Sequence, residues 1–232
     1  MTNIAIITAR GGSKRIPRKN IRSFCGKPII AYSIEAALDS KLFDEVMVST
    51  DSLEISEVAK NYGASVPFMR SEANSNDYAT TADVLREVLE RYQAIGKNFG
   101  YMCCLYPTAP FITAEKLRTA FNHMKEAEAD ALTPVVAFSF PPQRAFIISD
   151  GFLQYIHPEF IKTRSQDLEK IYHDCGQFYF YKVSSFLSGS GIKTVPLIIS
   201  EAEVQDIDNE EDWKLAEIKF NILLSTGTAR NK

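Results

Sequence analysis

The stretch that decides the fold lies at the start of the chain, where residues 4–20 read IAIITARGGSKRIPRKN. Its first five residues, Ile4 to Thr8, are apolar or β-branched, which predicts a buried strand. The residues that follow contain two adjacent glycines and several Lys and Arg side chains, with no acidic residue among them. The pattern therefore predicts a strand that ends in a cationic loop at one edge of a sheet.

This loop has the composition of a polyanion site. Gly11 and Gly12 allow the backbone to approach a ligand and to turn its N–H groups outward. The cationic side chains of the loop and its flank are Arg10, Lys14, Arg15, Arg18, Lys19 and Arg22. Because Lys and Arg supply charge to phosphate oxygens, we expect a triphosphate ligand. A solvated basic loop or a nuclear-localisation run is the alternative. The spacing matches neither G-x-x-x-x-G-K-[ST] nor G-x-G-x-x-G, so it supports neither Walker-type hydrolysis nor dinucleotide binding.

The composition limits the class of protein. The chain has 232 residues, 45% of them hydrophobic and 24% charged, with a formal net charge of −3, which suits one substantial core. A nucleic-acid binder is more often basic over a whole face, so we expect no nucleic-acid partner. The four cysteines include no C-x-x-C pair and are expected to be reduced. No apolar run approaches the ~20 residues of a membrane span, so we expect a cytoplasmic protein with no membrane partner.

Strand and helix patterns alternate along most of the chain. Further strands are predicted at 45–49, 65–68, 101–106, 131–137, 176–182 and 193–199, and helices at 28–40, 53–62, 81–95, 113–127 and 209–224. This alternation predicts an α/β fold with a doubly wound, mostly parallel sheet of the Rossmann-like kind found in nucleotidyltransferases. Ligands of such sheets bind beyond the carboxyl ends of the strands, so the cationic loop should meet Asp51, Pro107 and Thr108 there.

The alternation stops between about residues 139 and 174. Phe146 to Tyr155 form the pattern of a hairpin that turns on Asp150 and Gly151. We interpret residues 139–174 as an excursion from one domain spanning residues 1–224, followed by a disordered tail at residues 225–232.

A second chemical feature is the run Asp206-Ile207-Asp208, which precedes the last predicted helix. Alternate side chains of an extended segment share a face, so the two carboxylates can reach one site while Ile207 faces the core. Two hard oxygen ligands suit Mg²⁺, which could bridge to a triphosphate. The spacing alone is equally compatible with Asp208 capping the helix and a solvated Asp206.

Residues 9–20, ARGGSKRIPRKN, resemble the pattern A-R-x-x-S-K-x-x-P-x-K-N of the CMP-sialic acid synthetase (acylneuraminate cytidylyltransferase) family. The resemblance extends from residue 3 to about residue 220. It implies an enzyme that transfers CMP from CTP to the anomeric hydroxyl of a nine-carbon 2-keto sugar acid and releases pyrophosphate. It also implies that Asp206 and Asp208 bind Mg²⁺, and that the chain forms a homodimer, for which the hairpin is the expected interface.

The family resemblance also implies roles for individual residues. The expected catalytic residues, which stabilise charge on the phosphates, are Arg10, Lys14 and Lys19. The expected nucleotide-binding residues are Ala9, Arg10, Gly11, Gly12, Ser13, Lys14, Lys19, Asn20, Arg70, Thr80, Thr81, Pro107 and Thr108.

Sugar choice is expected in the excursion and the strand after it, because the other loops account for the nucleotide. The candidate sugar-binding residues are Tyr106, Arg144, Arg164, Gln166, His173, Gln177 and Tyr179. Tyr106 stands where sialic acid enzymes have a glutamine, and residues 173–176, HDCG, stand where they have R-P-N-G. Together with residues 140–146, FPPQRAF, these features are similar to the branch that activates pseudaminic acid. Two alternatives remain: activation of sialic, legionaminic or 3-deoxy-octulosonic acid, and a non-catalytic nucleotide- or sugar-binding protein.

Overall fold

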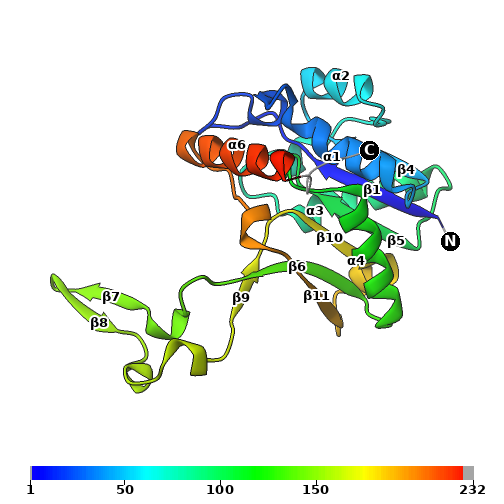
Figure 1. Ribbon diagram of the computed structural model, residues 1–232. Coiled ribbons are helices and arrows are strands. Elements are labelled where there is room, and N and C mark those ends of the chain that lie inside the picture. Colours follow the sequence, from blue (N-terminus) through cyan, green and yellow to red (C-terminus); the bar gives the residue numbers. More distant parts are fainter. Residues whose placement is uncertain (1, 227–232) are drawn as a thin grey trace.

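The computed structural model describes residues 2–226 and is built on a seven-stranded sheet (Figure 1). The strand order is β11-β6-β10-β5-β1-β4, and β9 pairs with the carboxyl-terminal half of β6. The strands are β1 (Asn3–Thr8), β4 (Glu45–Ser49), β5 (Tyr101–Leu105), β6 (Ala131–Ala137), β9 (Tyr172–Asp174), β10 (Phe178–Lys182) and β11 (Thr194–Ile198). β1, β4, β5, β6 and β11 run in one direction, and β9 and β10 run in the other. The predicted α/β fold with a mostly parallel sheet is confirmed.

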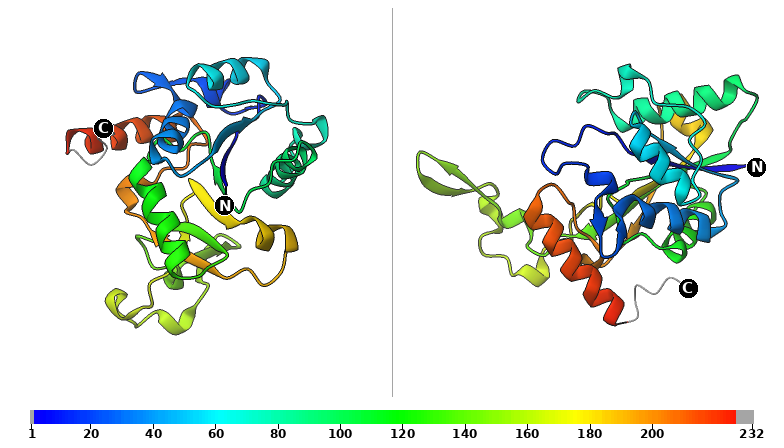
Figure 2. Two further views of the ribbon diagram at one scale, coloured as in Figure 1. Left: turned by 90° about the vertical axis from the view of Figure 1, so that its right-hand side faces the viewer. Right: turned by 90° about the horizontal axis from the view of Figure 1, so that it is seen from above.

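Helices cover both faces of this sheet. They are α1 (Ile29–Ser40), α2 (Leu53–Asn61), α3 (Thr81–Ala94), α4 (Ala114–Glu126), α5 (Val183–Ser188) and α6 (Glu210–Ser225). Because successive strand residues point to opposite faces, Ala5 and Ile7 pack under α1, α2 and α4, whereas Ile4 and Ile6 pack under α3 and α5. The left view of Figure 2 shows α3 and α4 on opposite sides of the sheet. No helix among residues 2–226 is long and apolar enough to cross a membrane.

Polar side chains cap the first turns of α2, α3, α4 and α6. Ser52, Thr80 and Thr113 each accept a hydrogen bond from a backbone N–H in the first turn of α2, α3 and α4. Asn209 does the same for α6 and forms a capping box with Asp212. These caps fix where each helix starts relative to the strand ends.

An aromatic cluster attaches α6 to the segment that follows the cationic loop. Phe24 contacts Tyr32 of α1 and both Trp213 and Phe220 of α6 in edge-to-face geometry, with ring centroids 5.5 to 5.7 Å apart. Phe24 lies in the short hairpin of β2 (Ser23–Phe24) and β3 (Lys27–Pro28). The cluster therefore holds the start of α6 close to the cationic loop.

Residues between β6 and β9 form an arm that stands away from the sheet (Figure 1). Its tip is the predicted hairpin, β7 (Phe146–Ser149) and β8 (Phe152–Tyr155). Asp150 and Gly151 make the turn with φ of 52° and 82°, as a two-residue hairpin turn requires. The rest of the arm contains short 3₁₀ helices at Pro142–Arg144, Pro158–Phe160 and Ser165–Asp167.

Three local predictions need comment. The strand expected at residues 65–68 is wrong, because only an isolated bridge from Ser65 to Met47 forms there and Pro67 has no N–H to extend it. Of the tail expected at residues 225–232, Ser225 belongs to α6, and residues 227–232 lie outside the described residues. All four cysteines are free thiols, as predicted. The remaining short 3₁₀ helices are Lys19–Ile21, Glu72–Asn74 and Glu201–Glu203.

Candidate active site

A cavity of about 490 Å³ opens where β1 ends at Thr8 and β5 ends at Leu105. β1 and β5 are parallel neighbours, so their carboxyl ends lie at the same edge of the sheet and the loops after both line the cavity. The predicted residues that line it are Arg10, Ser13, Lys14, Lys19, Asn20, Arg70, Thr80, Thr81, Tyr106, Pro107, Thr108 and Asp208. The structure therefore brings most of the predicted nucleotide residues to one cavity.

Two cations of the loop share one carboxylate that sequence reasoning missed. Arg10 Nη1 donates to Asp77 Oδ1 at 2.7 Å, and Lys14 Nζ donates to Asp77 Oδ2 at 2.5 Å. Hydrogen bonds from Lys14 and then from Arg10 hold the pKa of Asp77 below its ordinary value, so Asp77 is charged at neutral pH. Both cations face the cavity, where phosphate oxygens can reach them.

Gly11 helps to hold the loop in place, and neither Gly11 nor Gly12 lines the cavity. Gly11 N donates to Asp51 Oδ1 at 2.7 Å, and a Cβ at Gly11 would lie 3.1 Å from Ser52 Cβ, a close contact that favours glycine at this position. A Cβ at Gly12 would meet no atom within 4 Å, so the packing around Gly12 does not require a glycine. Ala9 is fully buried in the core and acts as packing beneath the loop.

Two further cations that line the cavity are less exposed: Lys19 is partly buried and Arg70 is buried. Lys19 Nζ donates to the carbonyl oxygen of Ile207 at 2.6 Å, and burial lowers the pKa of Lys19. Arg70 is buried, and its guanidinium donates to the carbonyl oxygen of Ser49 at 2.6 Å and to the Ser49 hydroxyl at 3.0 Å. Burial lowers the pKa of Arg70, while the charge of Asp51 opposes that effect. Both side chains are thereby oriented before any ligand arrives.

The aspartate pair lies beside Lys19. Ile207 is buried, and the charges of Asp208 and Asp206 both oppose the lowering of the Lys19 pKa, so both carboxylates lie near this ammonium. Asp208 lines the cavity and accepts from Arg15 Nη2 at 2.8 Å, whereas Asp206 is exposed and does not line it. Asp208 N donates to the carboxylate of Asp212, so the α6 capping box orients this segment.

Asp206 and Asp208 are the candidate metal ligands. Two carboxylates on one extended segment are hard oxygen ligands, and Mg²⁺ commonly takes one or two carboxylates and completes its shell with water and phosphate oxygens. Across residues 2–226 no group of three or more His, Cys, Asp and Glu side chains could hold a metal ion. The pair therefore fits a metal ion that takes some of its ligands from the protein and the others from a bound phosphate. It does not resemble a site made of protein ligands alone.

Thr80, Thr81 and Tyr106 also line the cavity. The Thr80 hydroxyl donates to Asp83 Oδ2 at 2.6 Å and accepts from the Asp83 N–H, so this hydroxyl serves the α3 cap. Thr81 lines the cavity without a hydrogen-bond role in the cap. Tyr106 is fixed through its backbone, since its N–H donates to the carbonyl of Gln177 and its carbonyl accepts from the Ser33 hydroxyl, both at 2.8 Å.

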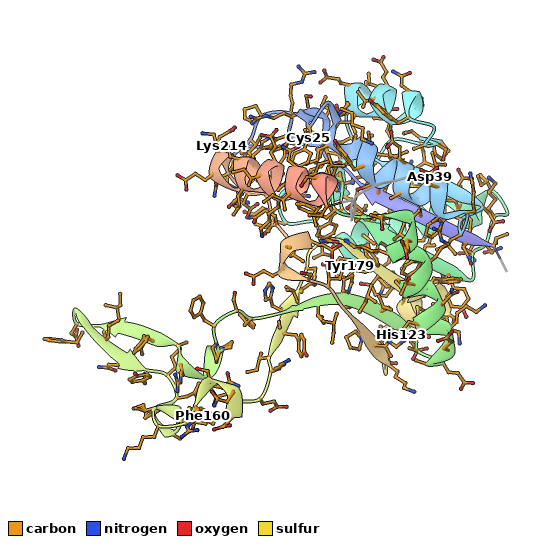
Figure 3. The ribbon with its side chains drawn as sticks, viewed as in Figure 1. Cys25, Asp39, His123, Phe160, Tyr179 and Lys214 are labelled. Carbon is orange, nitrogen blue, oxygen red and sulfur yellow. The ribbon has the colours of Figure 1, made fainter. Side chains whose placement is uncertain are left out.

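The other candidate sugar residues do not line this cavity. Tyr179 lies behind Tyr106, with ring centroids 5.5 Å apart, and donates to both carboxylate oxygens of Asp174 at 2.8 and 2.9 Å. Gln177 is buried and donates to the carbonyl of Glu203 at 2.6 Å, and the His173 ring lies 4.7 Å from that of Phe138. Arg144, Arg164 and Gln166 belong to the arm, which Figure 3 shows, with Phe160, apart from the body that carries Tyr179.

Several cavity residues were given no individual role in the site from the sequence. Asn74, Asn76 and Asp77 come from the polar loop before α3, and Arg15 and Ile16 come from unassigned positions of the cationic loop. The polar loop follows Arg70 and contains several amide and acid side chains, but that composition is common to surface loops. Only the fold brings Asp77 to the cations.

Comparison with known proteins agrees with this geometry. Residues 4–186 match a family model described as cytidylyltransferase. The chain is 42% identical over 226 residues to the pseudaminic acid cytidylyltransferase of Campylobacter jejuni, covering 96% of this chain and 97% of that protein. It is 36% identical over 228 residues to the CMP-N,N'-diacetyllegionaminic acid synthase of Legionella pneumophila, covering 94% and 95%. A solved structure of CMP:2-keto-3-deoxy-manno-octonic acid synthetase complexed with CTP aligns with a TM-score of 0.68, covering 98% of this chain and 100% of that chain at 18% identity, and supports the fold.

Proposed function

The chain belongs to the cytidylyltransferase family, and from this premise we propose that it transfers CMP from CTP to the anomeric hydroxyl of pseudaminic acid. The products are CMP-pseudaminic acid and pyrophosphate. The observation that carries the proposal is the likeness to the Campylobacter jejuni enzyme, which extends over nearly the whole of both chains. The cationic cavity gives that likeness a physical basis, because it suits a triphosphate.

In the proposed reaction the anomeric oxygen of the sugar acid attacks the α-phosphorus of CTP, and the bond from that phosphorus to the leaving pyrophosphate breaks. Negative charge grows on the phosphate oxygens during this step. Arg10, Lys14 and Lys19 would stabilise that charge, because their donors are oriented toward the cavity beforehand. Arg70, held by Ser49 at the carboxyl end of the neighbouring parallel strand β4, would contact the nucleotide from that side.

We propose that Asp206 and Asp208 hold Mg²⁺ when nucleotide is bound. The ion would supply Lewis-acid charge neutralisation to the phosphates. Asp208 would exchange its contact with Arg15 for that role, and Ile207, buried between the two, keeps both carboxylates on the side of the segment that faces Lys19.

The proposal extends to assembly and place of action. The arm exposes apolar side chains on its hairpin, with Ile148 77% and Phe152 74% exposed, which is more than an isolated surface would favour. We therefore propose a homodimer that buries this hairpin. We place the reaction in the cytoplasm because the proposed reaction consumes CTP.

Pyrophosphate release tests the proposal. Purified protein receives CTP, Mg²⁺ and one acid at a time, pseudaminic, legionaminic, N-acetylneuraminic or 3-deoxy-octulosonic acid, beside a control without sugar. We expect release with pseudaminic acid. Legionaminic acid is the second candidate acceptor, because the chain is also similar to the Legionella synthase. Release with another acid alone would replace the proposed acceptor, and CTP binding without release for any acid would support a non-catalytic binding protein.

A further inference from the structure

The cavity contains one carboxylate for which the proposed reaction has no role. Its lining includes the cations Arg10, Lys14, Arg15, Lys19 and Arg70, and the carboxylates Asp77 and Asp208. Asp208 belongs to the proposed metal pair, whereas Asp77 does not. Asp77 instead bridges two cations: Arg10 Nη1 lies 2.7 Å from Asp77 Oδ1, and Lys14 Nζ lies 2.5 Å from Asp77 Oδ2. A site built to attract a polyanion thus holds an anion of its own.

The segment that carries Asp77 is anchored on both sides. At its start, Glu87 of α3 accepts from Ser71 N at 2.9 Å and from Asn74 Nδ2 at 2.6 Å. At its end, Thr80 is fixed by the capping box of α3. Between them, Asn76 Oδ1 accepts from the N–H groups of residues 78 and 79, and the Asn76 carbonyl lies 3.3 Å from Arg10 Nη1. These anchors hold Asp77 where the cations can reach it.

A phosphate group and the Asp77 carboxylate compete for the same donors. Both are anions that accept short hydrogen bonds from Arg and Lys, and two anions beside the same pair of cations repel each other. Binding of phosphate at Arg10 and Lys14 therefore opposes the Asp77 contacts, and loss of the phosphate restores them.

We infer that Asp77 is an internal counter-anion of the nucleotide site, which occupies Arg10 and Lys14 in the free protein, yields them to the phosphates of CTP and takes them back as pyrophosphate leaves. Asp77 is thus a positioning residue that keeps both cations directed into the cavity and prevents pyrophosphate from binding too tightly. The inference rests on the proposed function, because it assigns the phosphates to this cavity.

Binding of pyrophosphate, measured by calorimetry at fixed Mg²⁺ without sugar acid, tests the inference. Asp77→Asn keeps the side-chain shape and removes the charge, so we expect the Kd for pyrophosphate to fall about five-fold, the size typical of an exposed ion pair. Asp77→Glu can still bridge the two cations and should stay near the wild-type value. Glu90→Gln removes an exposed carboxylate from α3, away from the cavity lining, and controls for net charge. In turnover, pyrophosphate should inhibit Asp77→Asn at lower concentration than it inhibits the wild type.

Repeating the measurement in a Lys14→Ala protein distinguishes competition between Asp77 and pyrophosphate for Lys14 from simple charge repulsion between the two anions. If Asp77 acts by occupying Lys14, the gain from Asp77→Asn must shrink when Lys14→Ala is already present. An equal gain in both backgrounds, or a weaker affinity in Asp77→Asn, would overturn the inference while leaving the proposed function intact. Wild-type protein that bound neither CTP nor pyrophosphate would overturn both.

Discussion

Lys14 and Lys19 belong to one loop but meet the cavity differently. The Lys14 side chain is 78% exposed, and the Lys19 side chain is 21% exposed and fixed to the Ile207 carbonyl. Lys14 therefore contributes little to folding, and once a phosphate displaces Asp77 its ammonium can follow charge as it develops on that phosphate. Lys19 contributes both to the site and to the attachment of the segment that carries the aspartates.

Replacing Lys14 by alanine should separate catalysis from stability. We expect kcat for Lys14→Ala to fall by about 10²-fold or more, the usual effect of removing one donor to a developing oxyanion, because no other side chain occupies its position. The melting temperature should stay close to that of the wild type. Lys60→Ala, which removes an exposed lysine of α2, is the matched control. A Lys14→Ala variant with near wild-type kcat would remove Lys14 from the mechanism.

Asp208→Asn tests the proposed metal pair. An amide is a weaker Mg²⁺ ligand than a carboxylate, so the Mg²⁺ concentration needed for half-maximal activity should rise about ten-fold. Glu211→Gln removes an exposed acid of α6 three residues away and should leave the Mg²⁺ dependence unchanged. An unchanged Mg²⁺ requirement in Asp208→Asn would show that this carboxylate serves only Arg15 and the turn before α6.

At the residue scale, the sequence predicted the cations better than their partners. The cationic loop could be singled out because unopposed charge next to two glycines has few other uses, and the resemblance to the family pattern selected Arg10, Lys14 and Lys19 within it. Asp77 could not be singled out, since a lone aspartate in a polar loop is ordinary. It lies 63 residues further along the chain than Lys14, and only the fold brings the two together. The sequence also could not predict what the Thr80 side chain does, because a threonine hydroxyl at this position can either cap the helix or contact a ligand.

At the scale of elements, the cap of α6 connects stability to the site. Asn209 accepts from the N–H groups of residues 211 and 212, and Asp212 accepts from the N–H of Asp208. The helix start and the metal-binding candidate are thus parts of one hydrogen-bonded turn. Weakening the cap should loosen Asp208 as well as α6.

Asn209→Ala should lower the free energy of unfolding by about 1 kcal/mol, the typical effect of losing an N-cap side chain. Asn209→Asp keeps a side-chain acceptor and should retain most of that stability. Urea denaturation followed by circular dichroism provides the measurement. Equal midpoints for the alanine variant and the wild type would mean that the capping box does not stabilise this helix.

Local signals explain which elements could be predicted. The hairpin at Asp150 and Gly151 and the helices after Ser52 and Thr113 depend on turn and cap chemistry within a few residues. The direction of β10 and the pairing of β9 with β6 depend on contacts between distant segments, so the sequence pattern could not determine them. Ser65 to Phe68 looked like a strand because of its apolar residues, but Pro67 cannot donate to a ladder.

At the scale of the whole molecule, the notable feature is the arm, because contacts within a single chain leave the apolar side chains of its hairpin exposed. Its hairpin is joined to the body through the strands β6 and β9, and both strands of the hairpin are largely exposed (Figure 1). Apolar surface of this kind is stable when another surface covers it, and a second copy of the chain is the proposed cover.

Replacing both Ile148 and Phe152 by serine should therefore convert the proposed dimer to a monomer. Analytical ultracentrifugation at micromolar concentration would measure the change in mass. Leu53→Ser is the matched control, because Leu53 is 74% exposed on α2, as exposed as Phe152 on the hairpin. If the double variant keeps the mass of a dimer, the interface lies elsewhere; if the wild type is already a monomer, the proposed assembly is wrong.

The most direct test of the account follows the α-phosphate. Protein is incubated with Mg²⁺, pseudaminic acid and CTP labelled with ³²P at either the α or the γ position. Cytidylyl transfer predicts that the α label appears in a product that contains the sugar acid, while the γ label appears only in pyrophosphate, and that Lys14→Ala forms this product far more slowly. Transfer of the γ label to the sugar, or no labelled sugar product from folded wild-type protein, would contradict the central claim.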